Sequence, residues 1–99
     1  MYFEYDPAKS AANKVKHGIG FDEAQKLWDD AYALTAESEA MEESRWLVVA
    51  EHGSKLWTAV ITYRGAAIRI ISVRRSREDE VRNYEKRKNE ARQNKHRGI

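Results

Sequence analysis

The sequence contains no cysteine, so neither a disulfide framework nor a thiolate metal site can stabilise the chain. It also has no apolar run near the roughly 18 residues that a membrane-spanning helix requires. Residues 1–7 lack the basic start and the apolar stretch of a signal peptide. We therefore expect a soluble, cytoplasmic protein that contacts no membrane.

Several catalytic signatures are missing as well. Metal-dependent nucleases bring several carboxylates onto one cation, whereas the adjacent Asp29 and Asp30 would diverge on a helix. The chain has no His-x-x-x-His or Asp-x-Asp spacing, no phosphate-binding glycine loop and no Gly-x-Ser-x-Gly element. The sequence therefore predicts a protein that uses no metal and no other cofactor.

Charge is distributed unevenly along the 99 residues, which we expect to form a single domain over 1–99. Residues 1–63 carry 6 Lys and Arg against 11 Asp and Glu, whereas residues 64–99 carry 12 against 5. The resulting charges of −5 and +7 add to the net charge of +2. A basic half of this kind is typical of proteins that bind nucleic acid or an acidic partner. A solvated helical tail is the alternative interpretation.

The N-terminal third predicts one short strand at residues 2–5 and two helices. Asp6 and Pro7 suit the N-cap and the first position of a helix, and Gly18 suits a left-handed C-terminal cap. The apolar side of this helix would consist of Ala8, Ala11, Ala12 and Val15. A second helix at about 21–31 would have the apolar side Phe21, Ala24, Leu27 and Trp28.

The middle of the chain predicts an antiparallel meander, rich in strand-forming residues. Its strands would lie at residues 46–50, 57–64 and 68–75, and its turns at residues 52–55 and 65–66. One face of the second strand would carry Trp57, Ala59, Ile61 and Tyr63. A short strand at 34–37 would lead into an irregular acidic loop at 37–44.

The C-terminal part predicts a basic helix that Ser76 is placed to cap. Val81 and Tyr84 are its last apolar anchors, so residues 87–99 would be a frayed or partner-bound helical tail. The predicted fold class is α+β. A small antiparallel sheet of three to four main strands would pack against two N-terminal helices, and the basic helix would follow it.

The run Ile68-Arg-Ile-Ile-Ser-Val-Arg-Arg75 is the most informative segment. Regular alternation would place Arg69 and Arg75 on one face of the strand and Arg74 on the other. Arginines in an apolar strand are costly to bury unpaired, so they either pair with carboxylates or face an open groove. Guanidinium groups suit phosphate, and Arg64 on the neighbouring strand could join the same surface. A structural ion-pair network is the alternative.

RNA cleavage without a metal needs a base, an acid and cations that stabilise the transition state. Histidine suits proton transfer, and Glu80 and Tyr84 lie four residues apart on one helix face. The candidate catalytic residues are Arg64, Arg69, Arg74, Arg75, His17, Glu80 and Tyr84, and the candidate RNA-binding residues are Lys16, Arg77 and Arg82. Structural alternatives stay open: His17 closing a helix end, and Tyr84 anchoring the core.

The chain also resembles a known family. Phe3-Glu-Tyr-Asp-Pro7, Lys9, Asn13, Lys16-His17-Gly18, Phe21 and Glu23-Ala24 resemble the opening of the BrnT toxin family, and Ile68–Arg75 with Glu80 and Tyr84-Glu85 resembles its closing signature. The resemblance covers about residues 2–85. Arg64, Arg69, Arg74, Arg75, Lys16 and His17 fall on the family's basic motif positions. Gly20 departs from the pattern, because a serine cap is common there.

The resemblance implies a ribonuclease toxin with a RelE-like fold and a BrnA antitoxin that binds DNA for the complex. We therefore expect a metal-independent endoribonuclease that inhibits translation and is held in a complex of two toxins and two antitoxins. The alternative is a catalytically inactive module that acts only by binding its partner. A DNA-binding function of the chain itself lacks a recognition-helix motif, so DNA contact would be indirect, through the antitoxin.

Overall fold

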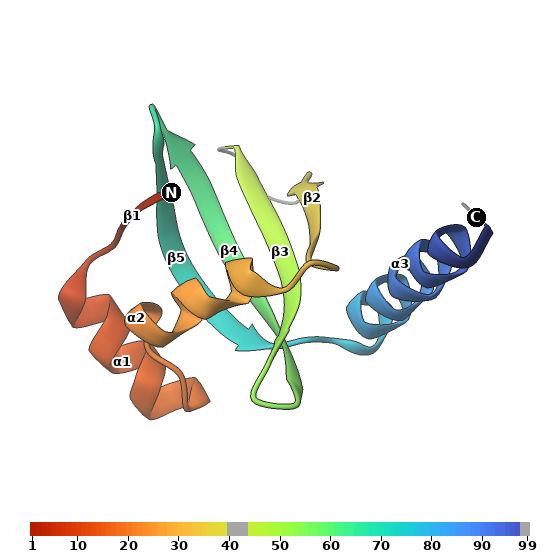
Figure 1. Cartoon of the computed structure of the whole chain (residues 1–99). Coiled ribbons are helices and arrows are strands. Elements are labelled where there is room, and N and C mark those ends of the chain that lie inside the picture. Colours follow the sequence, from red (N-terminus) through yellow and green to blue (C-terminus); the bar gives the residue numbers. More distant parts are fainter. Residues whose placement is uncertain (40–43, 98–99) are drawn as a thin grey trace.

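The computed structural model describes residues 1–39 and 44–97. In chain order, its elements are β1 (Tyr2–Glu4), α1 (Pro7–His17), α2 (Phe21–Ala24), the 3-10 helix η1 (Gln25–Asp29), β2 (Leu34–Ser38), β3 (Arg45–His52), β4 (Lys55–Arg64), β5 (Ala67–Arg75) and α3 (Glu78–Arg97). The strands form one sheet, α1 and α2 pack on it, and α3 contacts β3 and then projects away from the sheet (Figure 1). The predicted α+β class is confirmed.

The sheet is larger and less uniform than predicted. Its strand order is β1-β5-β4-β3-β2, which makes five strands where three to four main strands were expected. The antiparallel pairing of each strand from β2 to β5 with the next one is confirmed. The strand β1 instead pairs with β5 in parallel, which places Glu4 opposite Arg69. A strand of three residues carries no pattern that specifies its partner. Of the predicted acidic loop, Glu37 and Ser38 belong to β2, and residues 40–43 lie outside the described ranges.

The predicted hairpin turns are confirmed. Gly53 and Ser54 have φ angles of 61° and 65° between the paired residues His52 and Lys55, as a type I′ turn requires. A second tight turn follows Arg64 and starts β5. The second turn brings the last residues of β4 beside the first residues of β5.

The apolar core lies between the sheet and the segment formed by α2 and η1. Its members include the residues predicted for this role: Phe21, Ala24, Leu27, Trp57, Ala59 and Ile61. Trp28 packs against this core, with its ring centroid 4.9 Å from that of Phe3. Tyr63, predicted for the same face, is 50% exposed and stacks edge-on against Trp46. The apolar pattern therefore identified most of the core.

The second helix is shorter than predicted. It is α-helical for one turn, continues as η1 and ends at Asp29 instead of about residue 31. Gly20 at its N-cap offers no capping side chain, as its identity led us to expect. The side chain of Asp30 accepts hydrogen bonds from the backbone N–H groups of Tyr32 and Glu51, at 2.9 and 2.8 Å. This local turn ends the helix and leads the chain into β2.

The ends of α1 are as predicted, but its buried side is not. The Asp6 carboxylate caps the helix, and Gly18 ends it in the left-handed conformation. The predicted apolar side faces solvent, and Val15 is 89% exposed. The buried residues are Ser10 and Asn13. The apolar spacing was misleading, because the polar side chains of α1 satisfy backbone groups beneath the helix.

Asn13 makes the main contacts of this buried side. Its amide nitrogen donates to the backbone oxygens of Val73 and Ile19, at 2.9 and 2.8 Å. Its side-chain oxygen accepts from the backbone N–H of Val73 at 3.2 Å. The pairing of β1 ends at Arg69, so Asn13 takes over the edge of β5 where the strand stops. An unpaired buried backbone group would be costly there.

An irregularity in β5 changes which arginines share a face. Ile70 pairs with Ile61 and Ser72 pairs with Val60, so Ile71 is an extra residue without a partner on β4. Such a β-bulge reverses the alternation beyond it. The prediction that Arg69 and Arg75 share one face and Arg74 the other is therefore wrong. Arg69 and Arg74 lie opposite Thr62 and Thr58 on the open face, whereas Arg75 lies opposite Trp57 on the core face.

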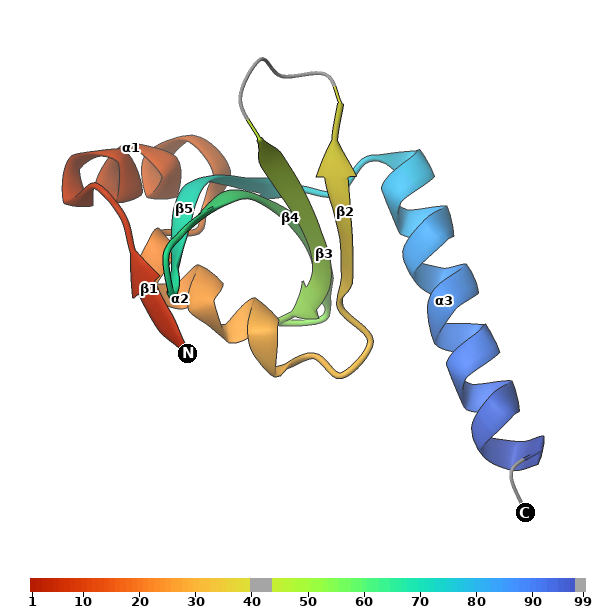
Figure 2. The ribbon, with the colours of Figure 1, turned by 90° about the horizontal axis from the view of Figure 1, so that it is seen from above.

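The helix α3 begins at Glu78 and projects away from the rest of the molecule (Figure 2). The expected cap at Ser76 is wrong, because its hydroxyl bonds to Thr58 Oγ1 at 2.8 Å. Glu80 provides the cap instead by accepting the backbone N–H of Arg77 at 2.8 Å. The predicted tail is helical as far as residue 97. No helix in the described part of the chain is both long and apolar enough to cross a membrane.

Candidate functional site

A basic pocket opens on the sheet face that α2 does not cover. Its lining residues are Lys9, Arg45, Thr62, Arg64, Arg69 and Ile71, and its volume is about 340 Å³. They come from α1 and from three adjacent strands, so only the folded sheet brings them together. Four of the six carry a positive charge and none is acidic. We call this hollow the basic pocket, and it suits an anion.

One carboxylate outside the lining pairs with two of its arginines. Glu4 Oε1 lies 3.5 Å from Arg64 Nη1 and 3.6 Å from Arg69 Nη1. At these distances the groups form ion pairs but no hydrogen bonds. Glu4 Oε1 is buried and has no hydrogen-bond partner among the described residues. Each guanidinium has five N–H donors. Glu4 therefore holds the two cations in place and leaves their donors available to a ligand.

Arg74 shares the open face but is already engaged. Its Nη1 and Nη2 donate to the two carboxylate oxygens of Glu80, at 2.7 and 2.9 Å. Glu80 Oε1 also accepts from Thr58 Oγ1 at 3.1 Å and from the backbone N–H of Arg77. Burial alone would raise the pKa of Glu80, but the hydrogen bonds and the charge of Arg74 outweigh it and lower the pKa to about 2. Its bond to Glu80 raises the pKa of Arg74.

Tyr84 is also hydrogen-bonded to a carboxylate within the protein. Its hydroxyl donates to Asp30 Oδ2 at 2.6 Å. Burial and this hydrogen bond raise the pKa of Tyr84 well above its ordinary value. Burial would also raise the pKa of Asp30, but hydrogen bonds from Tyr84 and from the backbone of Glu51 and Tyr32 lower it. The pair joins α3 to the turn before β2, and the tyrosine keeps its proton.

The remaining candidates lie at other places. Arg75 stacks over Trp57 on the core face, with its guanidinium carbon 5.5 Å from the ring centroid. Arg77 and Arg82 are exposed at the start of α3, and Lys16 is exposed at the end of α1. His17 is half-buried, and its imidazole ring makes no hydrogen bond or ion pair with another described residue. The structure thus joins Arg64 with Arg69, and Arg74 with Glu80, but gathers no single site from all the candidates.

The direction of α1 relative to β5 determines where the last residues of the helix lie. Lys9 lines the basic pocket beside Arg69, and Asn13 bonds to Val73 further along β5. The helix and the strand therefore run side by side in the same direction. His17 lies beyond Asn13, about 12 Å along the axis from Lys9 at 1.5 Å per residue. It is thus near the end of β5 that carries Arg74.

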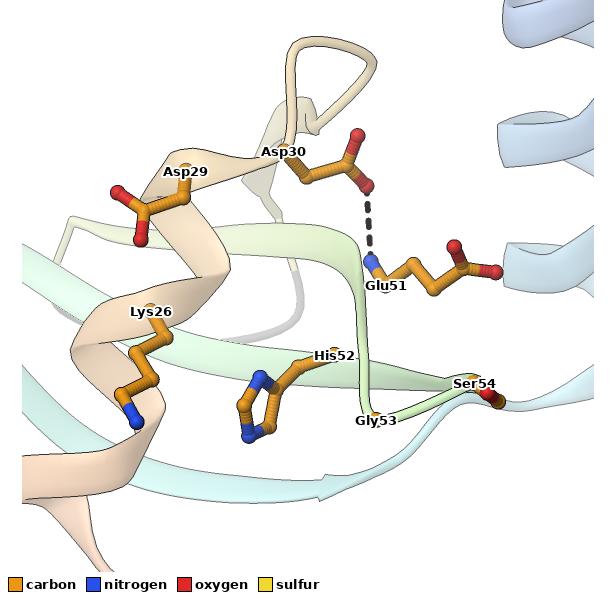
Figure 3. Close-up of a pocket in the computed structure, with 7 residues that line it drawn as sticks. All are labelled: Lys26, Asp29, Asp30, Glu51, His52, Gly53 and Ser54. Atoms are coloured by element: carbon orange, nitrogen blue, oxygen red, sulfur yellow. Dashed lines mark hydrogen bonds between the residues drawn. The ribbon is translucent and has the colours of Figure 1, made fainter.

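A second hollow of about 340 Å³ has a different character. Figure 3 shows its seven lining residues, Lys26, Asp29, Asp30, Glu51, His52, Gly53 and Ser54. Three of them are acidic, and the carboxylate of Asp30 bonds to the backbone N–H of Glu51. The His52 ring bonds to Glu23 at 2.9 Å. Carboxylates repel phosphate, so this hollow suits an RNA backbone less well than the basic pocket does.

Sequence reasoning missed four contributors to the basic pocket. Lys9 stood in the family-like opening but received no role, and Arg45 and Thr62 were not considered. Glu4 could not be assigned, because its contact with Arg69 depends on the parallel pairing of β1. Within residues 1–39 and 44–97, no three His, Asp or Glu side chains gather in a way that could hold a metal ion.

The chain matches a known protein family. Residues 5–80 match the family model described as the ribonuclease toxin, BrnT, of a type II toxin–antitoxin system. The match covers more than half of the chain and includes β2, β3, β4, β5 and the start of α3, whereas β1 precedes it. No curated protein matches the chain.

Proposed function

Because this chain belongs to the BrnT family of ribonuclease toxins of type II toxin–antitoxin systems, we propose that it cleaves RNA at the basic pocket. The observation that supports this proposal most strongly is the gathering of Lys9, Arg45, Arg64 and Arg69 around one hollow. These side chains would bind the scissile phosphate and stabilise the negative charge that grows on it in the transition state. Arg64 and Arg69 would supply paired donors, positioned by Glu4.

The proposed reaction uses groups of the RNA itself and needs no metal ion. The 2′-oxygen attacks the adjacent phosphorus and loses its proton to a base. The bond from phosphorus to the 5′-oxygen breaks, and that oxygen takes a proton from an acid. The products are a 2′,3′-cyclic phosphate and a 5′-hydroxyl end.

For proton transfer we retain His17 as the candidate. Glu80 is saturated with hydrogen bonds and Tyr84 holds its proton against Asp30, so both serve α3 in the free protein. His17 has no such engagement within the described residues. To reach a ribose it requires the RNA to follow α1 and β5 from the basic pocket toward Arg74. Lys16 beside it would add positive charge along that path.

The family also implies an antitoxin partner. We propose a BrnA-type antitoxin that covers the basic pocket with acidic or aromatic side chains, in a complex of two toxins and two antitoxins. Free toxin would cut cytoplasmic RNA and inhibit translation. We further propose that the five-stranded sheet with its N-terminal helices is a RelE-like arrangement.

A second candidate function is partner binding without catalysis. The pairing of Arg64 and Arg69 with Glu4, and of Arg74 with Glu80, favours it, because these arginines then act as structural ion pairs. In that case the basic pocket would bind an acidic segment of the antitoxin alone.

The test is to incubate antitoxin-free protein with end-labelled RNA in EDTA. A fully 2′-O-methylated RNA of the same sequence, which lacks the attacking hydroxyl, is the control. We expect cleavage of the normal RNA only, with cyclic phosphate ends. Intact normal RNA after incubation with folded protein, or activity that disappears in EDTA, would contradict the proposal.

A further inference from the structure

The distal part of α3 is an extension that the sheet does not need. The first turns of the helix are held by Glu80, by Tyr84 and by Lys88, whose ammonium lies 5.5 Å from the centre of the Tyr32 ring. The rest projects away from the domain in both views (Figures 1 and 2). From residue 85 to residue 97, Ala91 is the only apolar residue. Burial of apolar surface therefore does not explain this part of the helix.

The extension carries an excess of positive charge. Residues 86–97 carry six Lys and Arg and one Glu, which is a net charge of +5. Arg82, Lys86, Arg87 and Arg92 are exposed. Within the described residues, none of these four forms an ion pair with a carboxylate. The arginines of the sheet differ, because Arg64, Arg69 and Arg74 each have a carboxylate partner.

The chemistry of the extension favours RNA over protein as its ligand. Protein interfaces depend on aromatic and apolar anchors and are depleted in lysine. Interfaces with nucleic acid are polar and strongly positive. Four exposed cations without a carboxylate partner among the described residues, and one small apolar residue, fit the description of a nucleic-acid interface.

We propose that residues 82–97 of α3 form a sequence-independent RNA-binding arm. The arm contacts phosphates that flank the nucleotide held in the basic pocket. The arm begins two residues after Glu80, which bonds to Arg74 on the open face of the sheet. In the proposed arrangement, one RNA strand contacts both the basic pocket and the arm. This inference rests on the proposed function. The arm lies beyond residue 80, where the match to the family model ends.

The test measures binding apart from cleavage. The probe is a fluorescent, unstructured 40-nucleotide RNA that is fully 2′-O-methylated and cannot be cut. Its affinity is measured by anisotropy over a range of KCl concentrations. The arm variant carries Lys86→Gln, Arg87→Gln and Arg92→Gln, because glutamine has a helix propensity close to that of lysine and arginine. Circular dichroism checks that the helix is retained.

A matched control removes the same charge elsewhere. The variant with Lys14→Gln, Lys26→Gln and Lys55→Gln changes exposed lysines of α1, η1 and β4, so both variants fall from a net charge of +2 to −1. We expect the arm variant to bind at least about tenfold more weakly in 0.1 M salt. Its plot of log affinity against log salt should be shallower by up to about 2, at roughly 0.7 per lost phosphate contact. The control should bind like the wild type.

Two results would overturn the arm. One is an arm variant whose affinity for the RNA probe and whose salt dependence are unchanged. This result overturns the proposal also if the variant no longer co-purifies with the antitoxin. The other is an equal loss in both variants, which would show an effect of net charge alone. These outcomes are separable from failure of the proposed function, because the probe reports binding whether or not the wild type cleaves normal RNA.

Discussion

Arg74 and Glu80 form a two-fold hydrogen-bonded ion pair that joins β5 to the first turn of α3, with nitrogen–oxygen distances of 2.7 and 2.9 Å. Both side chains are largely buried, at 21% and 10% exposed. A charged pair in such a place is costly to break, because the remaining partner keeps an uncompensated charge. The pair therefore explains how a helix with little apolar surface is fixed to the sheet.

The ion pair predicts a specific pH dependence of stability. The pKa of Glu80 is lowered from 4.5 to about 2 in the folded chain, so its ionised form stabilises the fold. This contribution is complete above about pH 5 and is lost as the pH falls through 4.5 toward 2. We expect Glu80→Gln to lower the free energy of unfolding by up to about 3 kcal/mol at pH 7, and by much less near pH 2. Urea unfolding at several pH values measures this difference.

The control for this prediction is Glu78→Gln, which removes an exposed carboxylate from the same helical turn. Its effect on the free energy of unfolding should be small at every pH. A Glu80→Gln effect as large at pH 2 as at pH 7 would show that the ionised form is not what stabilises the helix.

A second prediction concerns the edge of β5. Asn13→Ala removes three buried hydrogen bonds, to Val73 N–H, Val73 C=O and Ile19 C=O. Leaving these backbone groups without partners should lower the free energy of unfolding by about 3 kcal/mol or more. Asn83→Ala, at an exposed position of α3, should be nearly neutral. Equal stability of the two variants in urea unfolding would be inconsistent with the edge-closing role of Asn13.

The sequence predicted those features that depend on local chemistry. The caps Asp6 and Gly18, the turn at Gly53 and the apolar residues of β4 follow from what each residue prefers in its own segment. The buried side of α1 could not be predicted in this way. Asn13 is buried because the pairing of β1 with β5 ends at Arg69 and leaves the rest of the β5 edge open, which is a property of the assembled sheet.

The candidate site shows the same division. The arginine-rich strand was identified from its composition, and Arg64 and Arg69 do line one pocket. The bulge at Ile71, however, places Arg74 and Arg75 on the faces opposite to those that regular alternation predicts. No residue type in the run indicates a bulge at this position. The spacing of four residues between Glu80 and Tyr84 predicts that both side chains lie on one face of a helix. Their partners, Arg74 and Asp30, come from segments whose position only the fold determines.

A third prediction separates the histidines. If His17 transfers a proton, His17→Ala should lower kcat for RNA cleavage by about 100-fold or more, with the fold retained. His52→Gln is the matched change, because glutamine can still bond to Glu23 in place of the ring. We expect this control to cleave at nearly the wild-type rate. Single-turnover kinetics measures both, and wild-type cleavage by the His17 variant would remove His17 from the mechanism.

The most direct test of RNA cleavage at the basic pocket is the single-turnover cleavage rate of the Arg64→Gln, Arg69→Gln double variant in EDTA. We expect a rate at least about 100-fold below that of the wild type, since both groups would stabilise charge on the scissile phosphate. Lys26→Gln with Lys55→Gln, which removes the same charge away from the basic pocket, should cleave normally. A folded double variant that cleaves at the wild-type rate would contradict the assignment of the basic pocket as the site of RNA cleavage.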